Sequence, residues 1–158
     1  MHSHNKFRRR FVSLLGLGGI GLVSKAAQAG NADDRFETRS THQVVYQCNK
    51  ADNDYFNHIL FSVGEMIRKY GDDIQVVVAA FGPGLQLLGE NPTFPVKKIH
   101  QQRVQSLDMY GVEFHACANT MKSLGWKKID LLDMAMVVPV GVDDIMQLQE
   151  AGYSYIAI

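Results

Sequence analysis

One apolar run constrains the fold more than any other part of the chain. Residues 74–81 (IQVVVAAF) are almost all apolar and rich in β-branched side chains, and Gly82-Pro83-Gly84 ends the run. A strand with this composition is buried on both faces, which is typical of a parallel sheet covered by helices on both sides. The run therefore predicts a central strand of an α/β protein.

Four further strand-like runs alternate with helical patterns along the chain. The runs lie at residues 43–48, 112–117, 135–140 and 153–158. The first helical pattern covers 54–70, where apolar residues recur at spacings of three and four, with Asp54 as the expected N-cap. Further helical patterns lie at 96–110, 119–124 and 142–151. Strands that alternate with helices predict a three-layer α/β/α sandwich with a five-stranded parallel sheet and right-handed crossovers.

The first 29 residues have the pattern of an export signal. Arg8-Arg9-Arg10-Phe11 precedes a short, glycine-rich apolar stretch, and Ala27-Gln28-Ala29 supplies the small residues at which a signal peptidase cuts. The arginine pair followed by phenylalanine resembles the twin-arginine signal of bacteria. We expect residues 1–29 to be cleaved, 30–42 to form a flexible leader, 43–158 to form the domain, and the mature protein to be periplasmic.

Composition argues against several classes of function. The mature chain keeps 11 of the 16 basic residues and all 16 acidic ones, and no basic patch suggests a nucleic acid partner. No apolar run of the mature chain is long enough to span a membrane. Gly16 to Gly21 match the dinucleotide fingerprint G-x-G-x-x-G, but they lie within the signal and lack its strand and helix context. We expect no cofactor and no metal site.

Candidate site residues follow the strands, because ligands of an open parallel sheet bind at the carboxyl ends of its strands. They are Asn49, Gly82, Pro83, Gly84, Cys117, Asn119, Thr120 and Gly141. Cys117 is the strong nucleophile among them, since backbone N–H groups at the start of the next helix favour a thiolate. The glycine-rich turn could bind an anion or small ligand, or could be only a tight turn.

Each reactive side chain also has a structural interpretation. Cys117 is either a nucleophile or a small buried apolar residue. His115 shares a strand face with Cys117 and is either its proton partner or a hydrogen-bonded core histidine. Cys48 ends the first strand and is either buried and inert or a second redox-active thiol. A Cys48–Cys117 disulfide is a further alternative in an oxidising compartment.

Several segments in order carry a family resemblance. They are 76–88 (VVVAAFGPGLQLL), 112–120 (VEFHACANT), 137–142 (VVPVGV) and 149–156 (QEAGYSYI). These segments resemble the DsrE/DsrF-like family. The resemblance implies a YchN-type parallel α/β/α fold and homo-oligomers, often trimers or hexamers. Some members relay sulfur as a persulfide, and the resemblance implies Cys117 as the carrier; Phe81 stands where many members have a histidine.

Three hypotheses follow for the function. The first is a periplasmic sulfur-binding or sulfur-relay protein, more a carrier than a turnover enzyme, in which Cys117 exchanges sulfane sulfur with donor and acceptor proteins or small sulfur compounds. The second is a ligand-binding or scaffold oligomer with a structural Cys117. The third is a thiol-disulfide or peroxide-reactive enzyme that uses Cys117 with Cys48. The first predicts that the sulfur of Cys117 is reachable from a pocket near the Gly82-Pro83-Gly84 turn.

Overall fold

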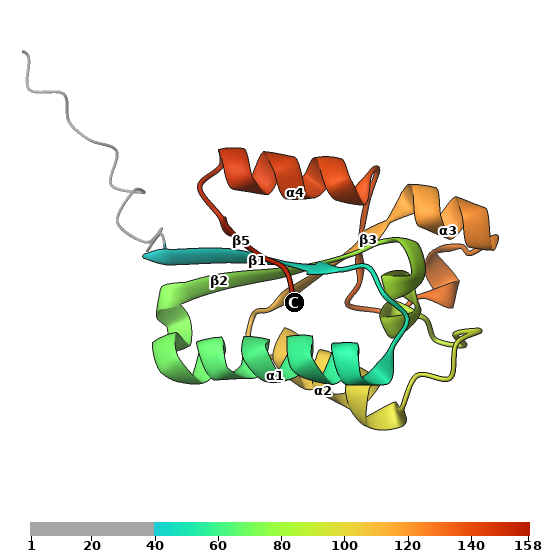
Figure 1. Ribbon diagram of the computed structural model, residues 1–158, viewed down its shortest axis with the longest axis horizontal. Helices are drawn as coiled ribbons and strands as arrows, with labels where there is room; N and C mark the ends of the chain where they lie inside the picture. Colours follow the sequence, from blue (N-terminus) through green and yellow to red (C-terminus); the bar gives the residue numbers. More distant parts are fainter. Residues whose placement is uncertain (1–39) are drawn as a thin grey trace, which may run out of the picture. The chain divides into compact units, whose positions relative to one another are not determined.

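The sheet of the protein lies between two layers of helices (Figure 1). The structure, a computed structural model, describes residues 40–158. Its strands are β1 (His42–Cys48), β2 (Ile74–Ala80), β3 (Glu113–Cys117), β4 (Met136–Val138) and β5 (Ser154–Ile156). They form one sheet in the order β4-β3-β2-β1-β5, and every pairing is parallel. The predicted five-stranded parallel sheet is confirmed.

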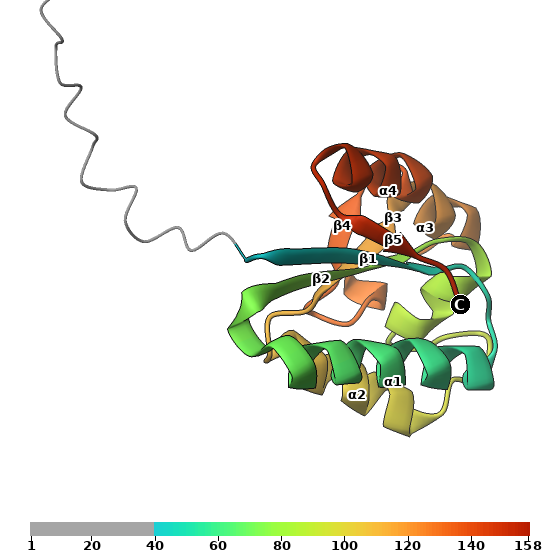
Figure 2. The ribbon, with the colours of Figure 1, turned by 60° about the vertical axis from the view of Figure 1, so that its left-hand side comes forward.

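The helices divide between the two faces of the sheet. Helices α1 (Asn53–Tyr70) and α2 (Lys98–Asp108) pack side by side on one face, and α4 (Gly141–Glu150) lies over the other (Figures 1 and 2). The short helix α3 (Ala118–Leu124) lies next to α4 at one end of the sheet. The fold is therefore the predicted three-layer sandwich.

Strand β2 explains why its sequence is apolar at nearly every position. Val76, Val78 and Ala80 belong to the large core on the α1–α2 side. Val77 and Ala79 belong to the smaller core that includes Ile145 of α4. Because residues alternate between the faces of a strand, both sets are buried in a central strand.

Helix α1 begins slightly earlier than the sequence predicts. Asp52, and not Asp54, is its N-cap, because the Asp52 carboxylate accepts a 2.7 Å hydrogen bond from the Tyr55 N–H. Asp54 lies in the first turn, where a negative charge favours the helix N-terminus. Gly71 ends the helix with a φ of 57°, which glycine adopts readily.

The other differences lie at element ends and at the sheet edges. The strand predicted to reach Phe81 ends at Ala80, and Gly82–Leu88 form a 3₁₀ helix, η2. The edge strands β4 and β5 have only 3 residues each. Pro139 follows β4 directly and has no N–H to continue the ladder.

The predicted signal peptide and most of the predicted leader lie outside the described residues. Among residues 40–158, no helix combines the length and the apolar character needed to cross a bilayer.

Candidate functional site

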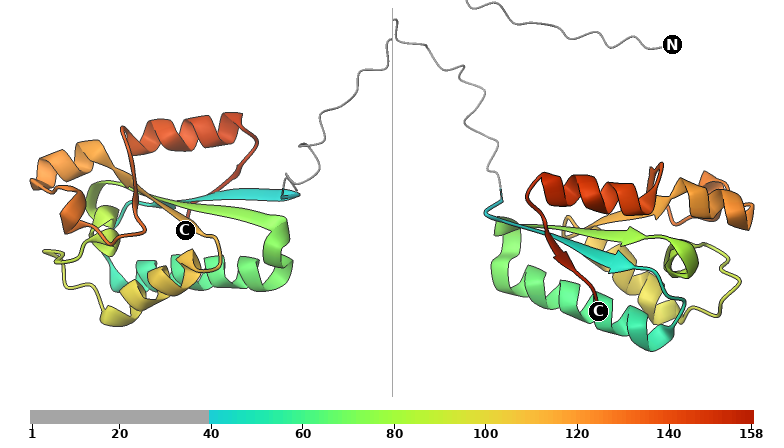
Figure 3. Two further views of the ribbon diagram at one scale, coloured as in Figure 1. Left: turned by 180° about the vertical axis from the view of Figure 1, so that it is seen from behind. Right: turned by 45° about the horizontal axis from the view of Figure 1, so that its top comes forward.

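Cys117 is the last residue of β3, and α3 begins at the next residue. The parallel strands point toward the same end of the sheet, where η2 and α3 also lie (Figure 3). The thiol is nearly buried, since only 4% of the residue is exposed. The sequence places the nucleophile at this edge, and the structure shows how closely other elements surround it.

The first turn of α4 covers Cys117. A Cβ added at Gly141 would lie 3.1 Å from the Cβ of Cys117 and 2.9 Å from the Cβ of Phe81. Ordinary contacts of a Cβ start near 3.4 Å, so only glycine permits this approach of the α4 backbone. The short distance brings the Gly141 N–H close to the sulfur.

Hydrogen-bond donors around the sulfur favour its thiolate. Burial raises the pKa of the Cys117 thiol, but hydrogen bonds from the Gly141 N–H and the Thr120 hydroxyl, together with the N–H groups of Thr120 and Asn119, outweigh burial and leave the pKa lowered. Donors that bind a charged form stabilise it relative to the neutral form. This thiol is therefore a better nucleophile than its burial alone would allow.

Thr120 connects the thiol to η2. The Gly82 N–H donates a 2.9 Å hydrogen bond to Thr120 Oγ1, across 38 residues of sequence. Because this oxygen accepts from Gly82, its own hydrogen is available for the sulfur of Cys117. Gly82 and Thr120 are thus held in one network with the nucleophile.

A pocket opens beside this network. It has a volume of about 450 Å³ and is lined by Gly82, Pro83 and Thr120 from the predicted set. The rest of its lining was not predicted: Ala51, Gln86, Thr93, Phe94, Ser123 and Leu124. Cys117 is absent from the lining, so the pocket reaches the residue that binds the sulfur and not the sulfur itself. Phe94 could have been suspected from its place between prolines in a loop at this edge.

Other members of the predicted set have different roles. Gly84 is buried, and an added Cβ would lie 2.2 Å from the Cys48 carbonyl oxygen, so this glycine permits close backbone packing. The Asn49 side chain accepts a hydrogen bond from the Tyr55 hydroxyl at 3.2 Å. Neither residue lines the pocket, and Gly84 is placed for close packing of the backbone.

His115 is held by carboxylates. Its Nδ1 lies 2.7 Å from Asp144 Oδ2, and its Nε2 lies 3.2 Å from Glu113 Oε2. Within residues 40–158, no hydrogen bond joins His115 to Cys117. The structure therefore gives no support to His115 as a direct proton partner of the thiol, because both ring nitrogens are already occupied.

Cys48 lies on the other face of the sheet. It pairs in register with Ala80, which pairs with Ala116, and all three belong to the core on the α1–α2 side. Cys117 follows Ala116 and so points to the α4 side. Burial raises the pKa of the Cys48 thiol to about 12, and its S–H donates to the Gly84 carbonyl oxygen at 3.6 Å. Both cysteines are free.

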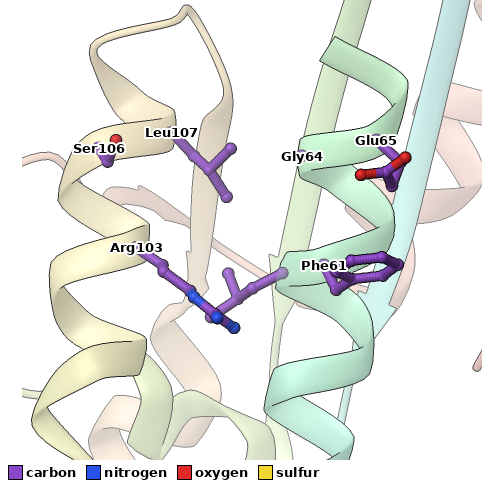
Figure 4. Close-up of a pocket in the computed structure, with 7 residues that line it drawn as sticks. Phe61, Gly64, Glu65, Arg103, Ser106 and Leu107 are labelled. Atoms are coloured by element: carbon purple, nitrogen blue, oxygen red, sulfur yellow. The ribbon is translucent and has the colours of Figure 1, made fainter. Parts of the chain in front are cut away.

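A second pocket and the grouping of potential metal ligands also bear on where a ligand could bind. A pocket of about 310 Å³ lies between α1 and α2, where Arg103 extends from α2 toward α1 (Figure 4). It is on the face of the sheet opposite the thiol. Among residues 40–158, no group of three or more histidine, cysteine, aspartate or glutamate side chains is placed to hold a metal ion.

The family pattern of DsrE/DsrF-like proteins matches residues 42–158, which include all five strands and the surroundings of Cys117. The chain belongs to the DsrE/DsrF-like family. This family member is similar in structure to a protein of unknown function, MTH1491, from Methanobacterium thermoautotrophicum, with 26% identity and a TM-score of 0.67. The match covers 74% of this chain and 99% of MTH1491.

The YchN protein of E. coli shares the fold of this DsrE/DsrF-like protein. Its identity is 14% and its TM-score 0.56, and the match covers 74% of this chain and 99% of YchN. No curated protein matches the chain.

Proposed function

We propose that this DsrE/DsrF-like protein is a sulfur carrier that holds sulfane sulfur as a persulfide on Cys117. One observation carries the proposal: Gly141, Thr120 and Asn119 direct donors at the Cys117 sulfur and lower its pKa in spite of burial. A thiol with a purely structural role needs no such donors. Sulfur relay by some members of the family supports the same assignment.

The transfer balances without an external oxidant. The Cys117 thiolate attacks the outer sulfur of a donor persulfide, R–S–SH, and forms a new S–S bond. The bond between the two donor sulfurs breaks, and the donor leaves as the thiolate R–S⁻. The hydrogen-bond donors that stabilise the Cys117 thiolate then lie next to the new persulfide. An acceptor thiolate removes the sulfur by the reverse reaction.

In this proposal, donor and acceptor approach through the pocket beside Gly82 and Thr120, which reaches Thr120 but is not lined by Cys117 itself. The walls of this pocket include apolar groups of Pro83, Phe94 and Leu124. Donors and acceptors in this proposal are proteins or small sulfur compounds that carry a reactive sulfur.

Intact mass after incubation with polysulfide tests the proposal. The wild-type chain should gain whole sulfur atoms, Cys117→Ser should gain none, and Cys48→Ala should gain as much as the wild type. Cys48→Ala is the matched control, because it removes the other thiol of the chain and leaves Cys117 in place. Sulfur uptake by Cys117→Ser at the wild-type level would refute the assignment.

Export is the second part of the proposal. The arginine pair Arg8-Arg9 and the exit Ala27-Gln28-Ala29 support a twin-arginine route to the periplasm. Replacement of Arg8 and Arg9 by lysine should leave the precursor uncleaved in the cytoplasm. Processing after residue 29 in the wild type, read by N-terminal sequencing, checks the cleavage site.

A homo-oligomer is the third part, with a trimer or hexamer as the expected state. Supporting observations are the edge position of β4 in the sheet and four exposed apolar side chains, Met136 and Val137 of β4 and Val142 and Met146 of α4. An unpaired strand edge beside an apolar surface is typical of an interface.

One observation favours a second candidate function. Only 4% of Cys117 is exposed, which suits a binding or scaffold oligomer in which the cysteine is structural. The absence of any mass gain with polysulfide would favour this candidate. The thiol-disulfide enzyme is the least favoured alternative, since Cys48 points to the opposite face and its thiol has a raised pKa.

A further inference from the structure

Helix α4 contacts β3 at two points, His115 and Cys117. His115 and Cys117 are two residues apart on one face of β3, and Asp144 and Gly141 are three residues apart on one side of α4. At one point His115 Nδ1 lies 2.7 Å from Asp144 Oδ2. At the other, the backbone of Gly141 lies against Cys117, where an added Cβ would be 3.1 Å from the Cys117 Cβ. The two contacts together fix the position of the first turn of α4 over the strand.

The hydrogen bond between His115 and Asp144 is well placed to be rigid. The side chain of His115 is 9% exposed and that of Asp144 is 16% exposed. A charge-assisted hydrogen bond at 2.7 Å, largely shielded from water, is stronger than an exposed pair. On its other side, His115 Nε2 faces Glu113, so the ring is held from both nitrogens.

We propose that His115 and Asp144 are positioning residues that hold the first turn of α4 on β3 and thereby keep the Gly141 N–H directed at the Cys117 sulfur. This inference rests on the proposed role of Cys117 as the reactive thiol. In this inference His115 acts by holding α4 in place and does not exchange a proton with the sulfur. This role of His115 also explains why an acidic residue lies near a thiol whose negative form must be stabilised: the carboxylate is needed for its bond to His115.

A positioning role and a purely electrostatic role of Asp144 predict opposite changes in the pKa of Cys117 when Asp144 is replaced. If the carboxylate acted only through its charge, its removal would favour the nearby thiolate and lower the pKa of Cys117. If it acts by holding Gly141 in place, its removal weakens a donor to the thiolate and raises the pKa. The direction of the change therefore separates the two roles.

The test measures alkylation of Cys117 by iodoacetamide as a function of pH in the mature protein. Asp144→Ala should raise the apparent pKa and slow alkylation about three- to tenfold at a pH below that pKa, as expected when one hydrogen bond to the thiolate is weakened but not lost. Asp143→Ala is the matched control. Asp143 lies in the same turn of α4, and its carboxylate accepts a 2.5 Å hydrogen bond from Gln147 Nε2, not from His115. Asp143→Ala should not raise the pKa.

Further variants keep the test decisive if Asp144→Ala does not fold. Asp144→Asn preserves size and should shift the pKa in the same direction by less, and His115→Gln should resemble Asp144→Ala. Circular dichroism melts establish that each variant is folded. A lowered or unchanged pKa in folded Asp144→Asn and His115→Gln would overturn the inference.

Alkylation does not involve sulfur transfer, so the two proposals can fail separately. A raised pKa in the Asp144 variants with no polysulfide uptake by the wild type would support the positioning role and refute the sulfur carrier. Normal uptake with no pKa change in the folded variants would do the reverse.

Discussion

Replacement of Gly84 by alanine should strongly destabilise the protein, because η2 and the end of β1 approach each other at this residue. The new Cβ would lie 2.2 Å from the Cys48 carbonyl oxygen, 2.4 Å from its carbon and 2.6 Å from the Asn49 nitrogen. All three are backbone atoms, so no side-chain rotation relieves the contact. The two backbones must separate by about 1 Å to reach an ordinary 3.4 Å contact.

The size of the effect follows from what that separation disturbs. Overpacking costs ~1–3 kcal/mol. The Phe81 N–H donates to the Cys48 carbonyl at 3.0 Å and the Gly84 N–H donates to the Phe81 carbonyl at 3.1 Å, and weakening these bonds adds ~1 kcal/mol. The lower entropy of alanine in the unfolded chain offsets ~0.4–1 kcal/mol. We expect a net loss of ~2–3 kcal/mol.

Urea unfolding followed by circular dichroism measures this loss. With a slope of ~1–3 kcal/mol/M, the midpoint of Gly84→Ala should fall by roughly 0.7–3 M. Gly64→Ala is the matched control, because an added Cβ within α1 meets no atom within 4 Å. That variant should gain ~0.5–1 kcal/mol from the better helix propensity of alanine. A midpoint of Gly84→Ala equal to that of the wild type would refute the packing role of Gly84.

Three further predictions concern pH, thiol reactivity and assembly. Burial lowers the pKa of His100 from its ordinary value of 6.5, so the folded protein favours the neutral ring. The free energy of unfolding should therefore fall as the pH drops below 6.5, where the unfolded chain binds a proton at this residue. His100→Leu should flatten this pH dependence in urea titrations between pH 7 and 5. Native protein should incorporate one iodoacetamide per chain, at Cys117, and two only after unfolding, because burial raises the pKa of Cys48 to about 12; rapid native labelling of Cys48, read by peptide mass, would contradict this. Val142→Glu with Met146→Glu should leave the circular dichroism spectrum unchanged and reduce the mass measured by light scattering, since both side chains are exposed on α4; an unchanged mass would exclude this surface as the interface.

Local patterns were enough to predict the sheet. The apolar run ending at Phe81 is buried by neighbours on both sides, so its composition directly reflects a central parallel strand. The edge strands were predicted too long. Each edge strand pairs with one neighbour only, and β5 pairs with β1 through just Val44, Val45 and Tyr46. The length of such a pairing cannot be predicted from the local sequence pattern.

The candidate site was predictable as a location but not as a geometry. The rule that parallel strands end at one edge brings Cys117, Thr120 and Gly141 into the same region of the sequence-based fold. The partner of His115 could not be found in this way, since Asp144 lies 29 residues further along the chain and contacts it only through the packing of α4. The close packing of Gly84 on Cys48 likewise depends on tertiary contacts.

The placement of the two cysteines on opposite faces of the sheet sets how long a loaded sulfur would persist. These are the only thiols in the chain, and a layer of β-strand backbone lies between their side chains. A persulfide on Cys117 would therefore have no internal thiol to resolve it into a disulfide. Discharge would require collision with a second molecule, so the lifetime of the loaded form would depend on the concentration of that molecule and not on any rearrangement within the fold.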